Sequence, residues 1–507
     1  MLYKRKKRGG FSNSLFKKGD DPKHFYVLCI IKFFISLVFT IFKIQKTSNV
    51  VLKKGAESIP SIKLIVLFVA ILAAYLYTSL SNKLSQQQLS YALLFFFSGL
   101  FALYAFVIYP NLDRIKPDIK KMDPGYQDYM LVRLYSDWPI VFFYVVAELF
   151  GQFCIVVFFW GVANDLYNKQ QAKRFYQWFI AAGCFGGITG AFLSKRIVRY
   201  CGEMFANIRS DNDKYNRLLL EKASQITSII ALLTLIVIGL FYKYIRESIS
   251  ATQPKIKLKK EKNPSFMESL RIIYSNNYLI ALSILIISCG VSMNIVQVTY
   301  KSYVKKHAAN DVIRYVDYEA NPTVVLNLLC ILGTFFLTSV LLKRLSWKQF
   351  AGIAPCVIFV LGFSFFTGST FRHWGWLSFL GSPENQITFV TWIAFADGTF
   401  GVLTKYIIFD NAKERAWLGV NKVTKRKSKG AVDVVSSRSG KGISSIIHIV
   451  FMRLFMQGED VTIISPYLLV AFTCFIILWF YSVNYIGNEL EQQQQQKKVK
   501  IKVVKKS

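Results

Sequence analysis

Residues 24–46, HFYVLCIIKFFISLVFTIFKIQK, decide the class of fold. A helix needs roughly 20 mostly apolar residues to cross a bilayer, and this stretch supplies them. No small-residue cleavage site follows, so we interpret it as a retained membrane span and not as a cleaved signal peptide. Similar runs recur along the 507 residues, of which 53% are hydrophobic, and the charged residues gather between them. This pattern excludes a soluble enzyme, a fibrous protein and a disordered chain.

About twelve apolar runs of this length occur along the chain. They begin near His24, Pro60, Ser90, Trp138, Tyr176 and Ala223, and then near Tyr278, Pro322, Gln349, Gln386, Gly442 and Val461. Two sets of six indicate two similar halves, as in transporters that are built from repeats. We therefore predict an all-α polytopic membrane protein with about twelve transmembrane helices in two six-helix halves.

The basic residues divide the chain further and indicate its orientation. We predict a basic N-terminus (residues 1–23), an N-terminal half (24–245), a basic linker (246–277), a C-terminal half (278–485) and a Gln/Lys-rich tail (486–507). Cytoplasmic loops of membrane proteins carry an excess of Lys and Arg. With an even number of spans, the basic N-terminus, linker and tail fall on one side, so we expect both termini in the cytoplasm.

The chain is strongly basic, with 63 Lys and Arg against 29 Asp and Glu and a formal net charge of +34. In a soluble protein this charge would indicate nucleic acid, but in a membrane protein it indicates an anionic solute or anionic lipid headgroups. The eight cysteines show neither metal nor disulfide spacing, and most fall inside apolar runs. We expect no metal, no cofactor and no nucleic-acid partner.

Two pairs of lysines lie near the outer ends of corresponding predicted spans. Lys43 and Lys46 are three residues apart in the first span, and Lys301 and Lys305 are four apart in the seventh. Both spacings place a pair on one face of a helix. The lysines are either anchors that reach the lipid headgroups or ligands of a phosphate chain held between the halves. Ammonium groups from both pairs would stabilise several anionic oxygens at once.

Intramembrane ionisable residues are costly, so each is a candidate for function. Glu148 lies near the middle of the fourth span, in VVAELFGQF (residues 145–153). A carboxylate there needs a cation or a proton, and it belongs either to a structural ion pair or to transport. Asp397 and Lys405 in the tenth span are eight residues apart, two turns along one helical face, and could repeat this arrangement.

The segment KRKSKGAVDVVSSRSGKG (residues 425–442) invites comparison with a phosphate-binding loop. It fails, because the required Gly five residues before the Gly-Lys pair is replaced by Val435, and no strand precedes it. Two interpretations stay open. The segment is either a basic cytoplasmic loop that leads into the eleventh span, or a set of lysines that meets a polyanion at the cytoplasmic mouth.

Several segments together resemble the ATP/ADP translocase family, the nucleotide transporters of plastids and of intracellular bacteria and parasites. In the first half, KIQKT (43–47), AELFG (147–151), FWGVAND (159–165) and AKRFY (172–176) resemble RDTKD, AELWG, FWGFANQ and AKRFY. In the second half, VQVTYKS (296–302), KYIIFDNAKERA (405–416) and KGAVDVV (429–435) resemble EVTWKS, KYSLFDPCKEMA and KAAIDVV. The blocks cover both halves and follow the order of the family.

The resemblance implies a fold like that of the major facilitator transporters and an exchange of ATP for ADP. It places functional charges at Lys46, Glu148 and Lys429, and Gln297 stands where the family block has Glu. The candidate substrate-binding residues are Lys43, Lys46, Glu148, Asn164, Gln297, Lys301, Lys405 and Lys429. Asn164 joins this set from the FWGVAND block.

From these observations we predict a nucleotide antiporter that works by alternating access as a monomer. Its expected partners are ATP and ADP, with phosphate as a further candidate, and membrane lipids. The Lys-, Ile-, Phe- and Asn-rich composition indicates a microsporidian-type parasite that imports host ATP through its plasma membrane, or alternatively a mitosome or other organelle membrane. Within transport, the alternatives are nucleotide–proton symport and carriage of other purine nucleotides.

Two other classes of protein are weighed against a transporter. A membrane enzyme would need an intramembrane His, Asp or metal-type cluster, yet the four histidines are scattered along the chain. A scaffold with basic cytoplasmic loops would leave Glu148 and the lysine pairs without a role. Both classes therefore explain fewer of the intramembrane charges.

Overall fold

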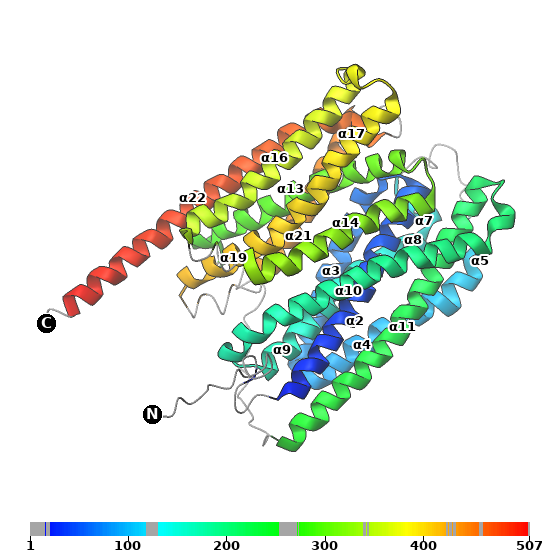
Figure 1. The fold of residues 1–507 in the computed structure, drawn as a ribbon. Helices are drawn as coiled ribbons and strands as arrows, with labels where there is room; N and C mark the ends of the chain where they lie inside the picture. Colours follow the sequence, from blue (N-terminus) through cyan, green and yellow to red (C-terminus); the bar gives the residue numbers. More distant parts are fainter. Residues whose placement is uncertain are drawn as a thin grey trace, which may run out of the picture.

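The computed structural model describes residues 16, 21–117, 130–252, 271, 273–337, 341, 344–421, 424, 428, 432–455 and 460–504. These residues form helices and turns and no strand. The predicted all-α class is therefore confirmed. The helices are long and nearly parallel, and they form two bundles that lie side by side (Figure 1).

The N-terminal bundle contains the helices up to residue 252. They are α2 (Pro22–Lys54), α3 (Ser58–Lys83), α4 (Gln86–Ala102), η1 (Leu103–Ile108), η2 (Tyr109–Asn111), α5 (Leu112–Ile115), α7 (Met130–Ser136), α8 (Trp138–Phe150), η4 (Gly151–Phe159), α9 (Trp160–Leu166), α10 (Lys169–Met204), η5 (Ala206–Ile208) and α11 (Asn212–Thr252). Its core is rich in phenylalanine, and the Phe42 ring lies 4.7 Å from the Phe101 ring between centroids.

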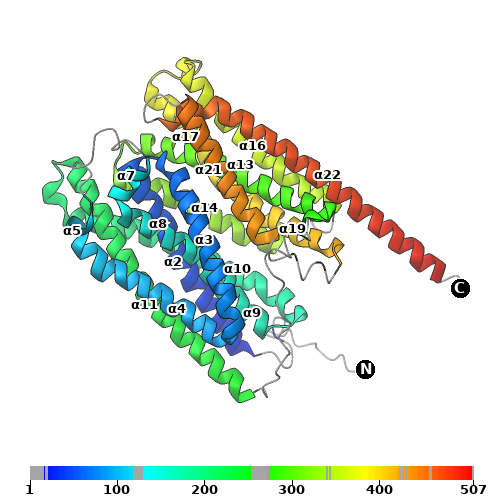
Figure 2. The same cartoon turned by 180° about the vertical axis from the view of Figure 1, so that it is seen from behind.

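The C-terminal bundle contains the helices from residue 277 onward. They are α13 (Asn277–His307), α14 (Val312–Leu332), η6 (Gly333–Leu337), α16 (Trp347–His373), η7 (Ser378–Leu380), α17 (Pro383–Ala396), η8 (Asp397–Gly401), α18 (Val402–Thr404), η9 (Lys405–Phe409), α19 (Asp410–Ala416), η10 (Trp417–Gly419), η11 (Val432–Ser436), α21 (Ser437–Phe455), η12 (Val461–Ile464) and α22 (Ser465–Val504). Helix α2 begins and α22 ends at the same end of the molecule (Figures 1 and 2).

Polar residues just before the apolar runs explain where several helices begin. Asp21 caps α2 by accepting a 2.9 Å hydrogen bond from the Lys23 amide, with Pro22 at the first helical position. Helices α4, α10 and α16 each begin with a capping box, in which the cap side chain and a glutamine three residues later satisfy each other's backbone amides. The caps satisfy amides that the helices leave open.

Eleven helical stretches in the described part of the chain are long and apolar enough to cross a membrane. The remaining predicted span, the eleventh, corresponds to α21, which carries Arg438, Lys441 and Arg453 within its 19 residues and is too polar to be counted with the others. This polarity has a structural reason. Helix α21 packs between α3 and α13 and turns Lys441 toward a cavity.

Two helices begin about ten residues, a few helical turns, before the apolar runs that predicted them. The sixth span was expected near Ala223, but α11 begins at Asn212 because its first turns are polar yet still helical. The eighth was expected near Pro322, but α14 begins at Val312 and Pro322 lies inside the helix. Membrane helices tolerate proline where neighbouring helices and side chains satisfy the freed backbone groups. Glu319 therefore lies within α14, just before the predicted apolar run.

Glycines allow α10 to pack closely on α2 over several turns. A Cβ atom added at Gly186 would lie 2.1 Å from the Phe33 carbonyl oxygen, and one at Gly190 would lie 2.6 Å from that of Leu37. No larger side chain fits at such distances. Small residues at this spacing let membrane helices approach backbone to backbone, and they fix α10 on the first span.

A cluster of charges ties the N-terminal bundle together at the end away from the start of α2. Lys54 Nζ lies 2.5 Å from the Asp137 carboxylate, and Lys116 Nζ lies within 3.6 Å of Asp137 and 3.0 Å of Glu221. Burial favours protonation of Asp137, but its hydrogen bond with Lys54 and the nearby lysine charges hold the pKa of Asp137 below its usual value. The cluster therefore stays charged near neutral pH and links α2, α5, α8 and α11.

The two bundles contact each other mainly through α10 with α14 and through α3 with α21. Helix α14 packs more extensively on α10 than on any helix of its own bundle (Figure 1). At one end of this contact, Arg199 donates a 3.0 Å hydrogen bond to the Asp317 carboxylate, and Lys195 lies 3.7 Å from it. Asp317 thus joins the bundles by charge.

We expect Asp317→Asn to weaken this contact only slightly. The Arg199 side chain is 53% exposed, so solvent screens the pair, and the loss should be at most about 1 kcal/mol. The melting temperature of the purified protein should fall by roughly 1–2 °C. Glu247→Gln, which removes an exposed pair with Lys243, is the matched control and should leave it unchanged. A much larger fall in the melting temperature of Asp317→Asn would show that this ion pair contributes more to stability than expected for a solvent-exposed pair.

Candidate functional site

A cavity of about 450 Å³ lies between the two bundles and is lined by charged side chains from both. The basic lining residues are Lys43, Lys46, Lys63, Lys301, Lys405, Lys413 and Lys441, and the acidic ones are Glu148, Glu319, Asp397, Asp410 and Asp433. Seven lysines against five carboxylates leave the cavity positive. A desolvated positive cavity of this kind attracts a multiply charged anion.

An ion pair between the first and fourth spans forms the N-terminal side of the cavity. Lys46 Nζ on α2 lies 2.5 Å from Glu148 Oε1 on α8, and the Lys46 side chain is only 8% exposed. The ammonium group also lies 4.9 Å from the centre of the Tyr144 ring, one helical turn before Glu148. These contacts hold both charges at the cavity wall.

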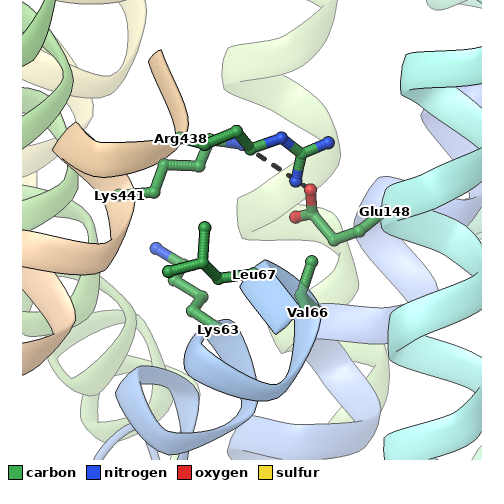
Figure 3. Close-up of a pocket in the computed structure, with 6 residues that line it drawn as sticks. All are labelled: Lys63, Val66, Leu67, Glu148, Arg438 and Lys441. Atoms are coloured by element: carbon green, nitrogen blue, oxygen red, sulfur yellow. Dashed lines mark ion pairs between the residues drawn. The ribbon is translucent and has the colours of Figure 1, made fainter. Parts of the chain in front are cut away.

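Cations from three further positions surround the same carboxylate. Lys441 Nζ on α21 lies 3.6 Å from Glu148 Oε2, so this pair crosses from one bundle to the other. Figure 3 shows Arg438 and Lys441 from α21 turned toward Glu148 in a small side pocket, which Lys63 from α3 also lines with its ammonium group pointing away from the carboxylate. Lys63 also donates a 2.9 Å hydrogen bond to Asn294 on α13. Glu148 is therefore the centre of a cationic cluster that spans both bundles.

Close helix packing brings Lys441 to this position. A Cβ atom added at Gly440 would lie 2.9 Å from the Ile287 carbonyl oxygen and 3.1 Å from the Gly290 Cα atom. Only a glycine lets α21 lie this close to α13, and Lys441 follows it directly. The segment from Val432 to Gly442 is helical, so this part of the predicted loop is wrong, whereas most of residues 425–431 lies outside the described residues. The alternative, in which its lysines face a polyanion, agrees with the place of Lys441.

The C-terminal side of the cavity holds a second ion pair. Lys301 on α13 pairs with Glu319 on α14, and their side chains are 13% and 5% exposed. Lys43 interacts electrostatically with both of these residues and with Lys46. Within the described residues, Lys43 has no ion pair of its own. It is therefore a cation that an anionic ligand can reach without displacing a carboxylate.

The tenth span is irregular where it meets the cavity. Its helix changes to the wider π form at η8 and η9, and such segments are frequent at functional sites. Lys405 Nζ pairs with Asp410 at 3.0 Å and not with Asp397, the partner that the sequence suggested. Asp397 is buried at the cavity wall and has no ion pair in the described part of the chain.

Most predicted substrate-binding residues meet in this cavity. Lys43, Lys46, Glu148, Gln297, Lys301 and Lys405 all line it. Asn164 does not, because it lies exposed on α9 and accepts a 2.6 Å hydrogen bond from the Tyr176 hydroxyl. Lys429 lies outside the described residues.

Sequence reasoning missed Lys63, Lys441 and Glu319. Lys63 stands alone within an apolar run, which is the signal that led to Glu148, so this residue could have been found. Lys441 and Glu319 were assigned to loops. The observed helix boundaries place both residues in helices, and both line the cavity.

Comparisons with known proteins agree with this arrangement. Residues 4–490 match the family model described as TLC ATP/ADP transporter. The chain is 28% identical over 490 residues to ADP,ATP carrier protein 1 of Rickettsia prowazekii, covering 93% of this chain and 94% of the relative. It is also 28% identical to ADP,ATP carrier protein 1 of Chlamydia muridarum, over 90% of this chain and 86% of the relative.

Solved structures of transporters share the fold at low sequence identity. A bacterial homologue of the iron transporter ferroportin superposes with a TM-score of 0.62 at 12% identity, covering 92% of this chain and 99% of that one. The nucleoside transporter NupG superposes with a TM-score of 0.52 at 12% identity, over 91% and 99%. These likenesses show that the chain shares the fold of these transporters, as the sequence predicted for a transporter.

Proposed function

The chain belongs to the TLC ATP/ADP transporter family, and we propose that it exchanges ATP for ADP across a membrane by alternating access. The resemblance that the sequence motifs indicated is thereby confirmed. No bond is made or broken in such a cycle, so ATP and ADP are transported substrates and neither acts as a cofactor.

The observation that carries the proposal is the lysine-lined cavity between the bundles. Lys46 comes from the N-terminal bundle, and Lys301 and Lys441 come from the C-terminal bundle. A phosphate chain that contacts all three joins the bundles, and it binds each ammonium group by a charge-assisted hydrogen bond. The carrier then closes around the substrate because the contacts on both sides exist together only in the closed state.

The carboxylates give the cavity a way to release its substrate. Without nucleotide, Glu148 engages Lys46 and Lys441, and Glu319 engages Lys301. An uncompensated buried charge is costly, so each carboxylate competes with the phosphate chain for its lysine. Binding is therefore strong enough to select an anion and weak enough to let it leave.

The proposed substrate-binding set is Lys43, Lys46, Glu148, Gln297, Lys301 and Lys405, with Lys429 added from the family motif. ATP carries one more negative charge than ADP, so exchange moves net charge unless phosphate accompanies ADP.

We propose import of host ATP across the plasma membrane of an intracellular parasite, by a monomer whose two termini are cytoplasmic. Chemical gradients then set the direction.

One observation favours a second candidate function, nucleotide–proton symport. Asp397 is a buried carboxylate at the cavity wall that has no ion pair among the described residues. Such a group can take up a proton instead of a cation. If symport applies, an inward proton gradient should drive ATP uptake into vesicles without internal nucleotide, and Asp397→Asn should remove that dependence.

The proposed function is tested by uptake of labelled ATP into intact bacterial cells that express the protein. Uptake should be saturable, and it should be inhibited by excess unlabelled ADP and ATP but not by adenosine, because the cavity selects the phosphate chain. Cells with an empty vector are the control. Equal inhibition by adenosine, or uptake no greater than in control cells, would contradict the proposal.

A further inference from the structure

The ion pair of the C-terminal bundle differs in origin from that of the N-terminal bundle. Lys46 and Glu148 come from the first and fourth spans, so a repeat would pair Lys301 of the seventh span with Asp397 of the tenth. Instead, Lys301 pairs with Glu319 of the eighth span. Asp397 stays without an ion pair in the described part of the chain.

Position 297 is also close enough to supply a carboxylate for Lys301, but it holds a glutamine. Gln297 lies one helical turn before Lys301 on α13 and reaches the same cavity. Residues four apart face each other on a helix, and the order Glu then Lys is the favourable one. The amide of Gln297 carries no charge, although the resembling family block has Glu here. The neutralising charge comes from α14 in its place.

Glu319 is buried in α14, where it pairs with Lys301 and interacts with the Tyr300 side chain. Its side chain is 5% exposed, and of its two oxygens Oε2 contacts Lys301, whereas Oε1 has no hydrogen-bond partner within the described residues. A buried carboxylate used only for stability would have both oxygens satisfied. Lys43 and Lys301 both interact with this carboxylate, and both line the cavity.

We propose that Glu319 is a positioning residue of the substrate site. It neutralises Lys301, a task that a carboxylate at position 297 would otherwise perform. It also displaces the phosphate chain from Lys301 when the nucleotide leaves. The inference rests on the proposed function, because it assigns the release step of that same site. Glu319 holds the Lys301 ammonium group at the cavity wall when no nucleotide is bound. When the phosphate chain binds, Lys301 exchanges one anionic partner for another.

Loss of Glu319 has a specific kinetic consequence. Nothing then competes with the phosphate chain for Lys301, so nucleotide binds more tightly and leaves more slowly. In Glu319→Gln, the maximal rate and the apparent KM should both fall at least about fivefold, the pattern of a variant that has gained ground-state binding. A structural defect would lower the maximal rate through the amount of active protein and leave the KM unchanged.

The test compares the wild type, Glu319→Gln, Gln297→Glu and the double variant Glu319→Gln/Gln297→Glu. Each is reconstituted into vesicles loaded with ADP, and the uptake of labelled ATP is normalised to the reconstituted protein. The double variant should recover both constants to within about twofold of the wild type, because the new carboxylate lies one turn from Lys301. Gln297→Glu alone gives Lys301 two competing carboxylates and should raise the KM. Glu384→Gln, at the exposed start of α17, is the control for loss of a glutamate.

Two results would overturn the assignment. One is a Glu319→Gln protein with the wild-type KM, and the other is a double variant no better than Glu319→Gln. If Glu319→Gln does not reach the membrane, the double variant provides the test. Recovery of transport in the double variant supports the role assigned to Glu319, and failure to recover transport contradicts it. Failure of the wild type itself to exchange ATP for ADP would sink the proposed function, so the two failures are distinguishable.

Discussion

Glu148→Gln is expected to lower ATP/ADP exchange at least about a hundredfold, the largest effect of any single substitution considered. Glu148 contacts Lys46 at 2.5 Å and Lys441 at 3.6 Å. Removing the carboxylate leaves buried cations without a partner, and breaking such a pair costs about 3–5 kcal/mol. Bound nucleotide then becomes the only anion that satisfies them. The variant should therefore retain nucleotide and fail to release it.

The measurement is uptake of labelled ATP by cells that hold ADP, normalised to the amount of protein in the membrane. Glu203→Gln, on the exposed end of α10, removes a glutamate of the same bundle and should transport normally. Nucleotide binding by purified Glu148→Gln protein should persist while transport is lost. Exchange at the wild-type rate would mean that Glu148 is only a structural ion-pair partner.

Lys46→Ala should lower ATP uptake about tenfold or more while the protein still reaches the membrane. Lys46 is buried at the cavity wall and pairs with Glu148. Its contact with a phosphate oxygen should contribute about 1.5–3 kcal/mol, the scale of a hydrogen bond to a charged group. Lys243→Ala, on the exposed face of α11, is the matched control and should have no effect. Normal uptake by Lys46→Ala would reduce Lys46 to a structural ion-pair partner of Glu148.

The double variant Lys46→Ala/Lys301→Ala extends this test. If both lysines hold one phosphate chain from opposite bundles, their separate losses should not add, because either loss already disrupts the shared ligand. Affinity of the double variant for ATP should then equal that of the weaker single variant. Strictly additive losses would indicate separate roles.

The sequence was informative for most charges inside clear apolar runs, although Lys63 was missed. Lys46, Glu148 and Lys301 were found in this way, because the cost of burying a charge makes such residues rare without a function. The apolar lengths likewise predicted most helices. Glu319 and Lys441 were missed because each stands just before the apolar run that predicted its span, whereas α14 and α21 begin earlier in the chain.

The pairing of charges could not be predicted in the same way. Lys405 pairs with Asp410, and Lys301 with a residue of a different span from the one that repeat symmetry suggests. Both choices depend on the rotation and packing of helices, which hydropathy does not encode. Close approach at Gly440, which brings Lys441 to Glu148, is a property of the assembled bundle.

The central claim, that one cavity carries ATP inward only in exchange for a nucleotide outward, is tested most directly with purified protein in sealed vesicles. Vesicles loaded with ADP and vesicles without nucleotide are given labelled ATP outside, and the initial rates are compared. We predict rapid uptake into the loaded vesicles, release of ADP in step with it, and uptake near background in the empty ones. Equal rates in loaded and empty vesicles would contradict the account.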